Sequence, residues 1–260
     1  MSAWSARRQL TYFVIVLGLV VAVAGAALAW WWPRPTCEDG RKNQNEQGID
    51  CGGDCLAVCL NEARPVKVLW ARVLPLVRSP AGSASSYDLA ALVENPNRHL
   101  ALKNAPYSLR FADQDNLFVN QVNGLLSLAP GEQFLIFVNN LEVGRRVPAR
   151  ARLEFTGPPT WQRAIESTPF SLTNQNFSNG PTPLLRAKIT NNSTTTYQRI
   201  EVPVALSDSE RNTFAASATV IDNLGAGETR EVSFSWPHLF AAEPVFIDFY
   251  PHVAHGSDVR

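Results

Sequence analysis

The sequence predicts an all-β protein of two tandem immunoglobulin-like antiparallel β-sandwiches, preceded by one transmembrane helix and a small disulfide-rich cassette. The first observation is an internal repeat, in which residues of the second half match residues of the first at an offset of about 95 positions. The second is a set of short runs in which apolar and polar residues alternate, which is the period of a strand with one buried face. The third is that no sustained helical period follows the N-terminal apolar run.

The repeat indicates the duplication of one domain of about 95 residues. Asn-Pro-Asn at 95–97 corresponds to Asn-Asn-Ser at 191–193, and Leu-Ala-Pro-Gly-Glu corresponds to Leu-Gly-Ala-Gly-Glu. Each of the two domains is long enough to bury its own core. The individual matches are Asn95 with Asn191, Asp113 with Asp208, Leu128 with Leu224, and Gly131-Glu132 with Gly227-Glu228.

The first element is a predicted transmembrane helix over residues 10–32. No charged side chain occurs from Leu10 to Trp32, and about 20 apolar residues span the hydrocarbon core of a bilayer. Arg7 and Arg8 precede the run and three tryptophans close it, as the positive-inside rule and the aromatic belt predict. We therefore expect a single-pass protein of the cell membrane, with residues 1–9 cytoplasmic and the other domains extracytoplasmic.

A cleaved signal peptide is the alternative interpretation of this segment. Ala27-Leu28-Ala29 fits the pattern of a signal-peptide cleavage site. The apolar run is longer than the usual h-region of about 7 to 15 residues, which favours the anchor. Both interpretations export the same ectodomain, and they differ in whether it stays attached to the membrane.

All four cysteines of the chain lie in the predicted cassette at residues 33–62. Outside the cytoplasm an even number of thiols in a short segment predicts disulfides, with three possible connectivities. A zinc site is the alternative, since four thiolates can complete a tetrahedral site, but the spacing lacks paired C-x2-C motifs. The predicted disulfide residues are Cys37, Cys51, Cys55 and Cys59.

The same cassette is rich in side-chain oxygens, which makes calcium a candidate cofactor. Hard carboxylate and amide oxygens on a tight loop are the ligands that Ca²⁺ prefers, although the spacing is not that of an EF-hand. The alternative is that these side chains cap turns while neighbouring glycines adopt positive φ. The candidate ligands are Asp39, Asn43, Asn45, Glu46 and Asp50.

The string from Cys37 to Cys55 reads C-x-D-G-x-x-N-x-x-E-x-G-x-D-C-G-G-x-C. It resembles a short cysteine cassette that recurs in surface and secreted proteins. This resemblance implies a membrane-anchored bacterial or archaeal surface protein.

The two predicted sandwiches occupy residues 63–157 and 158–253, with a tail at 254–260. Asp113–Asn116 and Asp208–Asn212 are expected to form equivalent hairpin connections, because Asp and Asn make local side-chain bonds in turns. The expected strands are 66–74, 87–93, 107–111, 134–138, 150–155, 184–189, 202–206, 231–236 and 245–250.

The order of these turn and strand motifs resembles the immunoglobulin-like domains of the late-embryogenesis-abundant type 2 group and the bacterial FxLYD group. Phe111-Ala-Asp113 and Leu206-Ser-Asp208 stand where those domains have an aspartate at a strand end, and Leu-x-x-Gly-Glu follows in both halves. The resemblance implies the fold and an extracytoplasmic or stress-associated setting. It brings no catalytic residue to this chain.

Composition and motifs favour a non-catalytic protein. A net charge of +0 with 18% charged residues is not typical of a nucleic-acid binder. His252, His255 and Asp258 could hold a metal but are expected in a frayed tail, and Trp161 in the linker is the aromatic residue most suited to a ligand. The favoured function is a structural or protein-interaction module of the cell envelope, with an unidentified envelope protein as partner. The alternative is a solute- or glycan-binding surface module.

Overall fold

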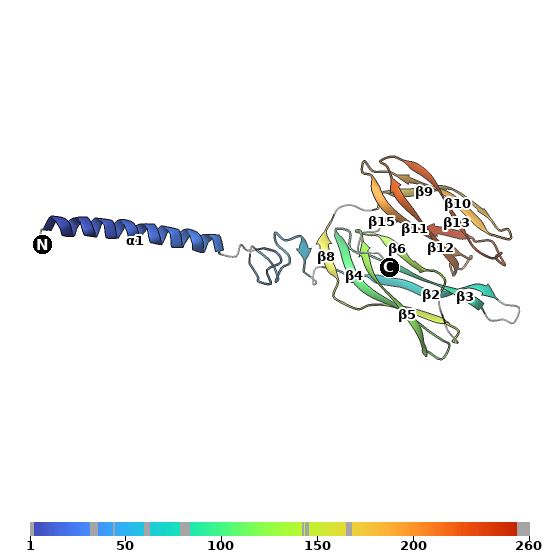
Figure 1. Cartoon of the computed structure of the whole chain (residues 1–260). Helices are drawn as coiled ribbons and strands as arrows, with labels where there is room; N and C mark the ends of the chain where they lie inside the picture. The colour runs from blue at the N-terminus through green and yellow to red at the C-terminus, as the bar shows by residue number, and fades with distance from the viewer. Residues whose placement is uncertain are drawn as a thin grey trace. The chain divides into compact units, whose positions relative to one another are not determined.

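The computed structural model of the protein describes residues 3–31, 36–43, 45–59, 63–78, 84–141, 143, 146–164 and 168–253. The predicted all-β class with one N-terminal helix is confirmed, because every described regular element after the N-terminal helix α1 (Ala3–Trp31) is a β-strand (Figure 1). The chain divides into two compact units, residues 1–54 and 55–260. The strands are β1 (Ala57–Val58), β2 (Lys67–Arg78), β3 (Ala84–Glu94), β4 (Leu100–Ala112), β5 (Phe118–Leu128), β6 (Gln133–Val138), β7 (Arg150–Phe155), β8 (Thr160–Arg163), β9 (Phe170–Ser178), β10 (Leu184–Asn191), β11 (Tyr197–Ser207), β12 (Thr213–Leu224), β13 (Thr229–Ser235), β14 (Phe246–Phe249) and β15 (His252–Val253).

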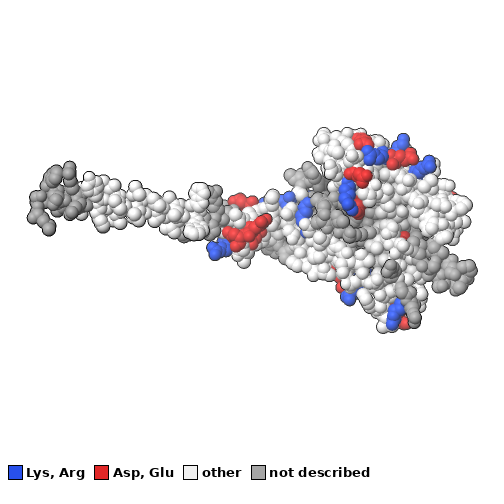
Figure 2. Space-filling view, viewed as in Figure 1, with Lys and Arg blue, Asp and Glu red and all other residues white. Residues whose placement is uncertain are grey.

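From Leu10 to Leu28, helix α1 has no charged residue on any side. Its stretch Leu10–Leu28 is long and apolar enough to cross a membrane, and none of it is buried by the rest of the protein. Figure 2 shows no charged side chain along the described part of this helix. An exposed helix of this kind requires an apolar surrounding, which a bilayer supplies. A signal sequence has the same features. Trp32, the predicted end of the span, lies outside the described residues.

The first β-sandwich is built from residues 57–163. One sheet has the order β1-β8-β4-β5, with β7 also paired to β4, and the other has the order β2-β3-β6. Their facing sides enclose a core that includes Leu89, Leu109 and Ile136. Strand β8, which a boundary at 157/158 assigns to the second sandwich, instead pairs with β4 and β1 in this sheet. The boundary between the two sandwiches therefore lies after Arg163 rather than at residue 157.

The second β-sandwich is built from residues 170–253. One sheet has the order β13-β10-β9, and the other has the order β12-β11-β14 with β15 also paired to β11. Their core includes Leu185, Ile189, Val204 and Phe234. All strand pairs described in both sandwiches are antiparallel, as the alternating pattern and hairpin turns predict.

The internal repeat has the same local geometry in both halves. Asn95 and Asn191 are both completely buried. The Nδ2 of Asn95 donates to the carbonyls of Leu100 and Ala129, while that of Asn191 donates to Thr195, Leu224 and Gly225. Each amide thus satisfies the carbonyls of two separate loops, which explains why the same residue occupies both positions.

The two predicted hairpin turns are confirmed, and they are built alike. Asp113 Oδ1 accepts hydrogen bonds from the backbone N–H groups of Asp115 and Leu117, while Asp208 Oδ1 accepts them from Glu210 and Asn212. These turns join β4 to β5 and β11 to β12. A carboxylate that accepts successive N–H groups fixes the turn and the register of both hairpins.

A third apolar cluster joins the outer faces of the two sandwiches. Ala90, Leu92 and Leu135 of the first sandwich pack with Ala205 and Ala216 of the second. Strand β3 therefore has both faces buried, because its alternate residues Leu89, Ala91 and Val93 belong to the first core. A strand that is covered on both sides needs an unbroken apolar sequence, which the run Leu89–Val93 provides.

Candidate functional site

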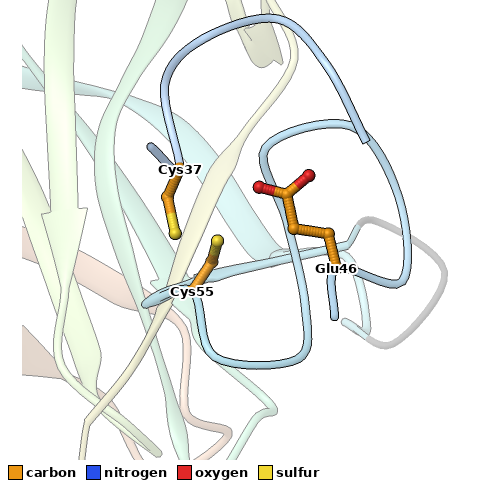
Figure 3. Close-up of side chains that lie close together, drawn as sticks. All are labelled: Cys37, Glu46 and Cys55. Carbon is orange, nitrogen blue, oxygen red and sulfur yellow. The ribbon is translucent and has the colours of Figure 1, made fainter. Parts of the chain in front are cut away.

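The predicted disulfides are confirmed, since all four cysteines of the cassette are disulfide-bonded. Figure 3 draws Cys37, Glu46 and Cys55, whose sulfur and carboxylate atoms lie within 4.8 Å of one another. Sulfurs in disulfides are not thiolates, so they do not supply the ligands that zinc requires. The zinc alternative for these four residues is therefore wrong in this structure.

Of the five candidate calcium ligands, Asp39, Glu46 and Asp50 have carboxylate oxygens that accept hydrogen bonds from N–H groups. In contrast, Asn43 Oδ1 is buried and has no hydrogen-bond partner among the described residues. Both carboxylate oxygens of Asp50 accept from the backbone N–H of Gly40, at 3.0 and 2.9 Å. Glu46 Oε2 accepts from the N–H groups of Asn43 and Asp50, each at 3.2 Å. These contacts are the turn-capping roles that the sequence allows for acidic and amide residues.

Asp39 and the two asparagines complete this network. Asp39 Oδ1 accepts from Arg41 N–H at 2.9 Å, and its Oδ2 accepts from Asn43 Nδ2 at 2.8 Å. The Asn43 amide, helped by the backbone N–H groups, holds the pKa of Asp39 below its usual value. Asn45 adopts a left-handed conformation with φ of 62°. The calcium assignment stays a prediction, because the carboxylate oxygens of Asp39, Glu46 and Asp50 have N–H donors that would compete with a cation.

Glycine is required at one point of the cassette. Gly53 has φ of +59°, and a Cβ built on it would lie 2.0 Å from the carbonyl oxygen of Asn45. Any other residue would be forced into the backbone of the preceding loop. The Gly-Gly pair between Cys51 and Cys55 thus shapes the loop that holds the carboxylates.

Two residues suggested as ligand-binding side chains belong instead to the protein interior. Trp161 is 2% exposed and lies on β8, where it pairs with Val58 and Leu102 and packs in the first core. Its position near the Pro-Pro turn suggested a linker, but β8 closes the sheet there. His252 is also buried, on β15, whereas the sequence predicts a frayed tail. His255 and Asp258 lie outside the described residues, and His99 and His238 are exposed.

His252 forms a buried polar contact at the junction between the sandwiches. Its Nδ1 lies 2.9 Å from Glu132 Oε1, and the two side chains are only 4% and 2% exposed. Its ring also packs against Phe134, with centroids 4.4 Å apart. The backbone of His252 pairs with Glu201 on β11, so one residue connects the second sandwich to a turn of the first.

The repeat shows how this contact is built. Glu132 and Glu228 occupy equivalent turns, where their Oε2 atoms accept the backbone N–H groups of Ala129 and Gly225. Their Oε1 atoms differ in partner: Glu228 binds Arg230 of β13 in its own sandwich, while Glu132 binds His252 of the other sandwich. The same turn therefore binds within its own sandwich in one half and joins the two sandwiches in the other. The sequence repeat identifies Glu132, but it does not indicate its partner.

The sandwiches show few exposed aromatic side chains. Among the described residues after the cassette, the strongly exposed aromatic residue is Phe118, which is 55% exposed. It lies at the start of β5, next to the exposed Leu117, and Arg110 is positioned over its ring. Val147, in the loop that approaches the same end of β4, is also exposed. On the visible face of the sandwiches, Figure 2 shows basic and acidic side chains interspersed rather than separated.

Comparison with known proteins gives little information about this chain. No protein-family model matches it, and no curated protein matches it either. Among solved structures it is similar to the crystal structure of red sea bream transglutaminase, with 12% identity and a TM-score of 0.25. That similarity covers 73% of this chain and 29% of the transglutaminase, so this chain spans less than a third of that protein. A similarity at this level supports no functional conclusion.

Proposed function

We propose that this chain is a non-catalytic, single-pass membrane-anchored protein, whose cassette and two sandwiches act outside the cytoplasm as a structural or protein-interaction module of the cell envelope. The observation that supports this most strongly is the succession of an exposed apolar helix and a cassette with every cysteine oxidised. Disulfides persist in oxidising compartments, so the cassette is expected on the extracytoplasmic side of the helix. Arg7 and Arg8 favour the same orientation.

The joined sandwiches support an interaction role. Residues 55–260 form one compact unit in which a shared apolar cluster and a buried Glu132–His252 pair fix the two sandwiches. A rigid unit presents its surface loops in a constant arrangement, which lowers the entropy lost when a partner binds. One end of the first sandwich has an exposed apolar surface that a protein partner would cover. It consists of Leu117, Phe118 and Val147.

Membrane topology tests the first part of this proposal. Protease treatment of intact cells should remove residues 36–260, and mass spectrometry should find a mature protein that still contains residues 10–32. A mature N-terminus at Trp30 would replace the anchor with a cleaved signal peptide. Protection of the ectodomain in cells with a single membrane would contradict the extracytoplasmic assignment.

Co-purification from membranes tests the second part. We expect a membrane or envelope protein to co-purify with the full-length chain, and Phe118→Ser to weaken that association. Val220→Ser is the matched control, because Val220 is also exposed but lies on the second sandwich. Equal loss in both variants would show that the Phe118 end is not the contact surface.

A further inference from the structure

A cavity of about 450 Å³ lies between the two sandwiches. The first sandwich contributes Asp88 of β3, Phe137 of β6 and Asn139 of the following loop, and the second contributes Ser217 of β12, Ser235 of β13 and Trp236. Binding sites for small molecules have volumes of about 300 to 1,000 Å³ and often lie at domain junctions. The position and size of this cavity are therefore those of a ligand site.

Asp88 places a carboxylate in this cavity. The residue is 3% exposed, and its Oδ1 accepts a hydrogen bond from the backbone N–H of Asn140 at 2.9 Å. No second donor from the described residues reaches the carboxylate, and none of the described lining residues is Lys, Arg or His. Because side chains alternate along a strand, Asp88 points to the same face of β3 as Ala90 and Leu92 at the apolar junction.

An ionised Asp88 carboxylate in this position destabilises the folded protein at neutral pH. Desolvation raises the pKa of Asp88 to about 6, and the hydrogen bond from Asn140 opposes this rise only in part. The carboxylate is then mostly ionised at pH 7 and lacks a cation among the described residues that line the cavity. Apart from Asp88, the charged residues with described side chains on β2, β3, β6, β11, β12 and β13 do not line the cavity; they are Lys67, Arg72, Glu94, Arg199, Glu201, Asp222, Arg230 and Glu231.

We infer that this cavity binds a small organic cation, with an ammonium or guanidinium group at the Asp88 carboxylate and the alkyl part against Phe137 and Trp236. The aromatic side chains favour a cation whose hydration is weak. Trp236 is held in place, because its Nε1 donates to the carbonyl of Ala216 at 2.9 Å. A divalent metal ion fits less well, since Ca²⁺ prefers several carboxylates and six to eight oxygens, whereas the described lining offers one carboxylate.

This inference is independent of the membrane anchor, and titration calorimetry tests it on the full-length protein in detergent micelles. 1,4-Diaminobutane represents a free amine, and N-acetylarginine amide represents the side chain of a protein partner. N-acetylcitrulline amide is the neutral control, because it has the shape of the arginine probe without its charge. We expect at least one cationic probe to bind and the neutral probe to bind at least about 10-fold more weakly, as loss of a desolvated charge contact costs this much. The inference is overturned if the neutral probe binds as tightly as the cationic probes. It is also overturned if neither cation binds at an upper concentration of about 20 mM, which is about 100 times a typical weak Kd.

Variants assign the binding to Asp88. Asp88→Asn keeps the acceptor for Asn140 N–H and should abolish binding of the cation, whereas Asp222→Asn removes an exposed charge from β12 and should leave it unchanged. In the wild-type protein, affinity should fall about 10-fold between pH 7 and pH 5 as Asp88 is protonated. Ser217→Lys provides a test that does not depend on the folding of Asp88→Asn. A tethered ammonium in the cavity should raise the Tm and block the probe, and unchanged binding in this variant contradicts the assignment.

Discussion

At the scale of single residues, a few buried polar side chains determine how the apolar faces are used. Asn95 and Asn191 hold the loops of their own sandwiches, while Glu132 and His252 join one sandwich to the other. These groups are buried and satisfied, which is the condition under which polar residues stabilise an interior. Removal of one partner leaves a buried group without its hydrogen bond.

We predict that His252→Ala lowers the free energy of unfolding by roughly 3 kcal/mol, because it leaves Glu132 Oε1 buried without this partner. Arg230→Ala is the matched control, since it removes the partner of the equivalent Glu228 at a site more than a third exposed. It should cost less than about 1 kcal/mol. Urea denaturation measures both values, and equal effects would show that the buried pair makes no special contribution.

The pKa of Asp88 predicts a pH dependence of stability. The folded protein has a pKa of about 6 at Asp88, raised from 3.8, so it binds more protons than the unfolded chain between these values. The contribution of this group to stability is therefore largest below about pH 4, falls as pH rises to about 6, and is constant above.

Asp88→Asn should remove this decrease, so the Tm of the variant should exceed that of the wild type by about 2 to 6 °C at pH 8, with little difference at pH 4. Thermal melts from about pH 4 to 8 measure the difference in Tm between the variant and the wild type. This range extends about two pH units on each side of the pKa of Asp88. An identical offset at every pH would show that packing, rather than ionisation, is responsible. Asp222→Asn should follow the wild-type curve.

At the scale of elements, the strands that the sequence predicts have either apolar alternation, as in β7, or a short unbroken apolar run, as in β3 and β6. Strand β7 has the predicted bounds of 150–155, while β5, β9 and β12 were not predicted. Strand β5 contains Asn120, Asn123 and Gly124, which have low strand propensity, and pairing with β4 overrides that preference. The sequence pattern does not reveal β12 either, because this strand packs closely against neighbours on both faces and carries small residues such as Ala215 and Ala216 there.

The cassette gives an element-scale prediction. Gly53→Ala should prevent the loop from closing, because the added Cβ meets the Asn45 carbonyl and the positive φ disfavours alanine. We expect free thiols in the purified variant, measured by thiol titration under denaturing, non-reducing conditions. Gly180→Ala, where a Cβ meets no atom within 4 Å, should show none. A fully oxidised Gly53→Ala protein would contradict the requirement for glycine.

Calcium provides a second test of the cassette. Because Asp50 and Glu46 already accept hydrogen bonds from backbone N–H groups, we expect Ca²⁺ to bind no more tightly than about 1 mM. Calorimetry of the chelator-treated protein measures this value. A dissociation constant in the micromolar range, lost in Asp50→Asn, would establish the calcium site that the ligand types suggest.

At the scale of the whole molecule, the sandwiches form one body. The sequence repeat suggests that each half folds by itself between 63–157 and 158–253, but β8 and β1 belong to the first sheet and the junction cluster is shared. A fragment that ends at residue 157 therefore lacks Trp161 from its core and exposes Ala90 and Leu92. Separate melting of such fragments is not expected.

We predict a single cooperative thermal transition for residues 55–260 within the full-length protein, because the junction buries apolar side chains of both sandwiches. Ala90→Arg should place a charge in this junction and produce two transitions. Val220→Arg, at an exposed position, should retain one. Calorimetry distinguishes these outcomes, and two transitions in the wild type would show that the halves are thermodynamically independent.

The sequence by itself determined the features that depend on local pattern. Alternation defined one face of most strands, the repeat located equivalent turns, and four clustered cysteines predicted disulfides. The tertiary structure decided what covers the second face of β3 and which group pairs with Glu132. His252 lies 120 residues after Glu132 along the chain, and local sequence patterns do not predict contacts between residues so far apart. The acidic cavity at Asp88 likewise exists only where two copies of one domain meet, because each copy contributes part of its wall.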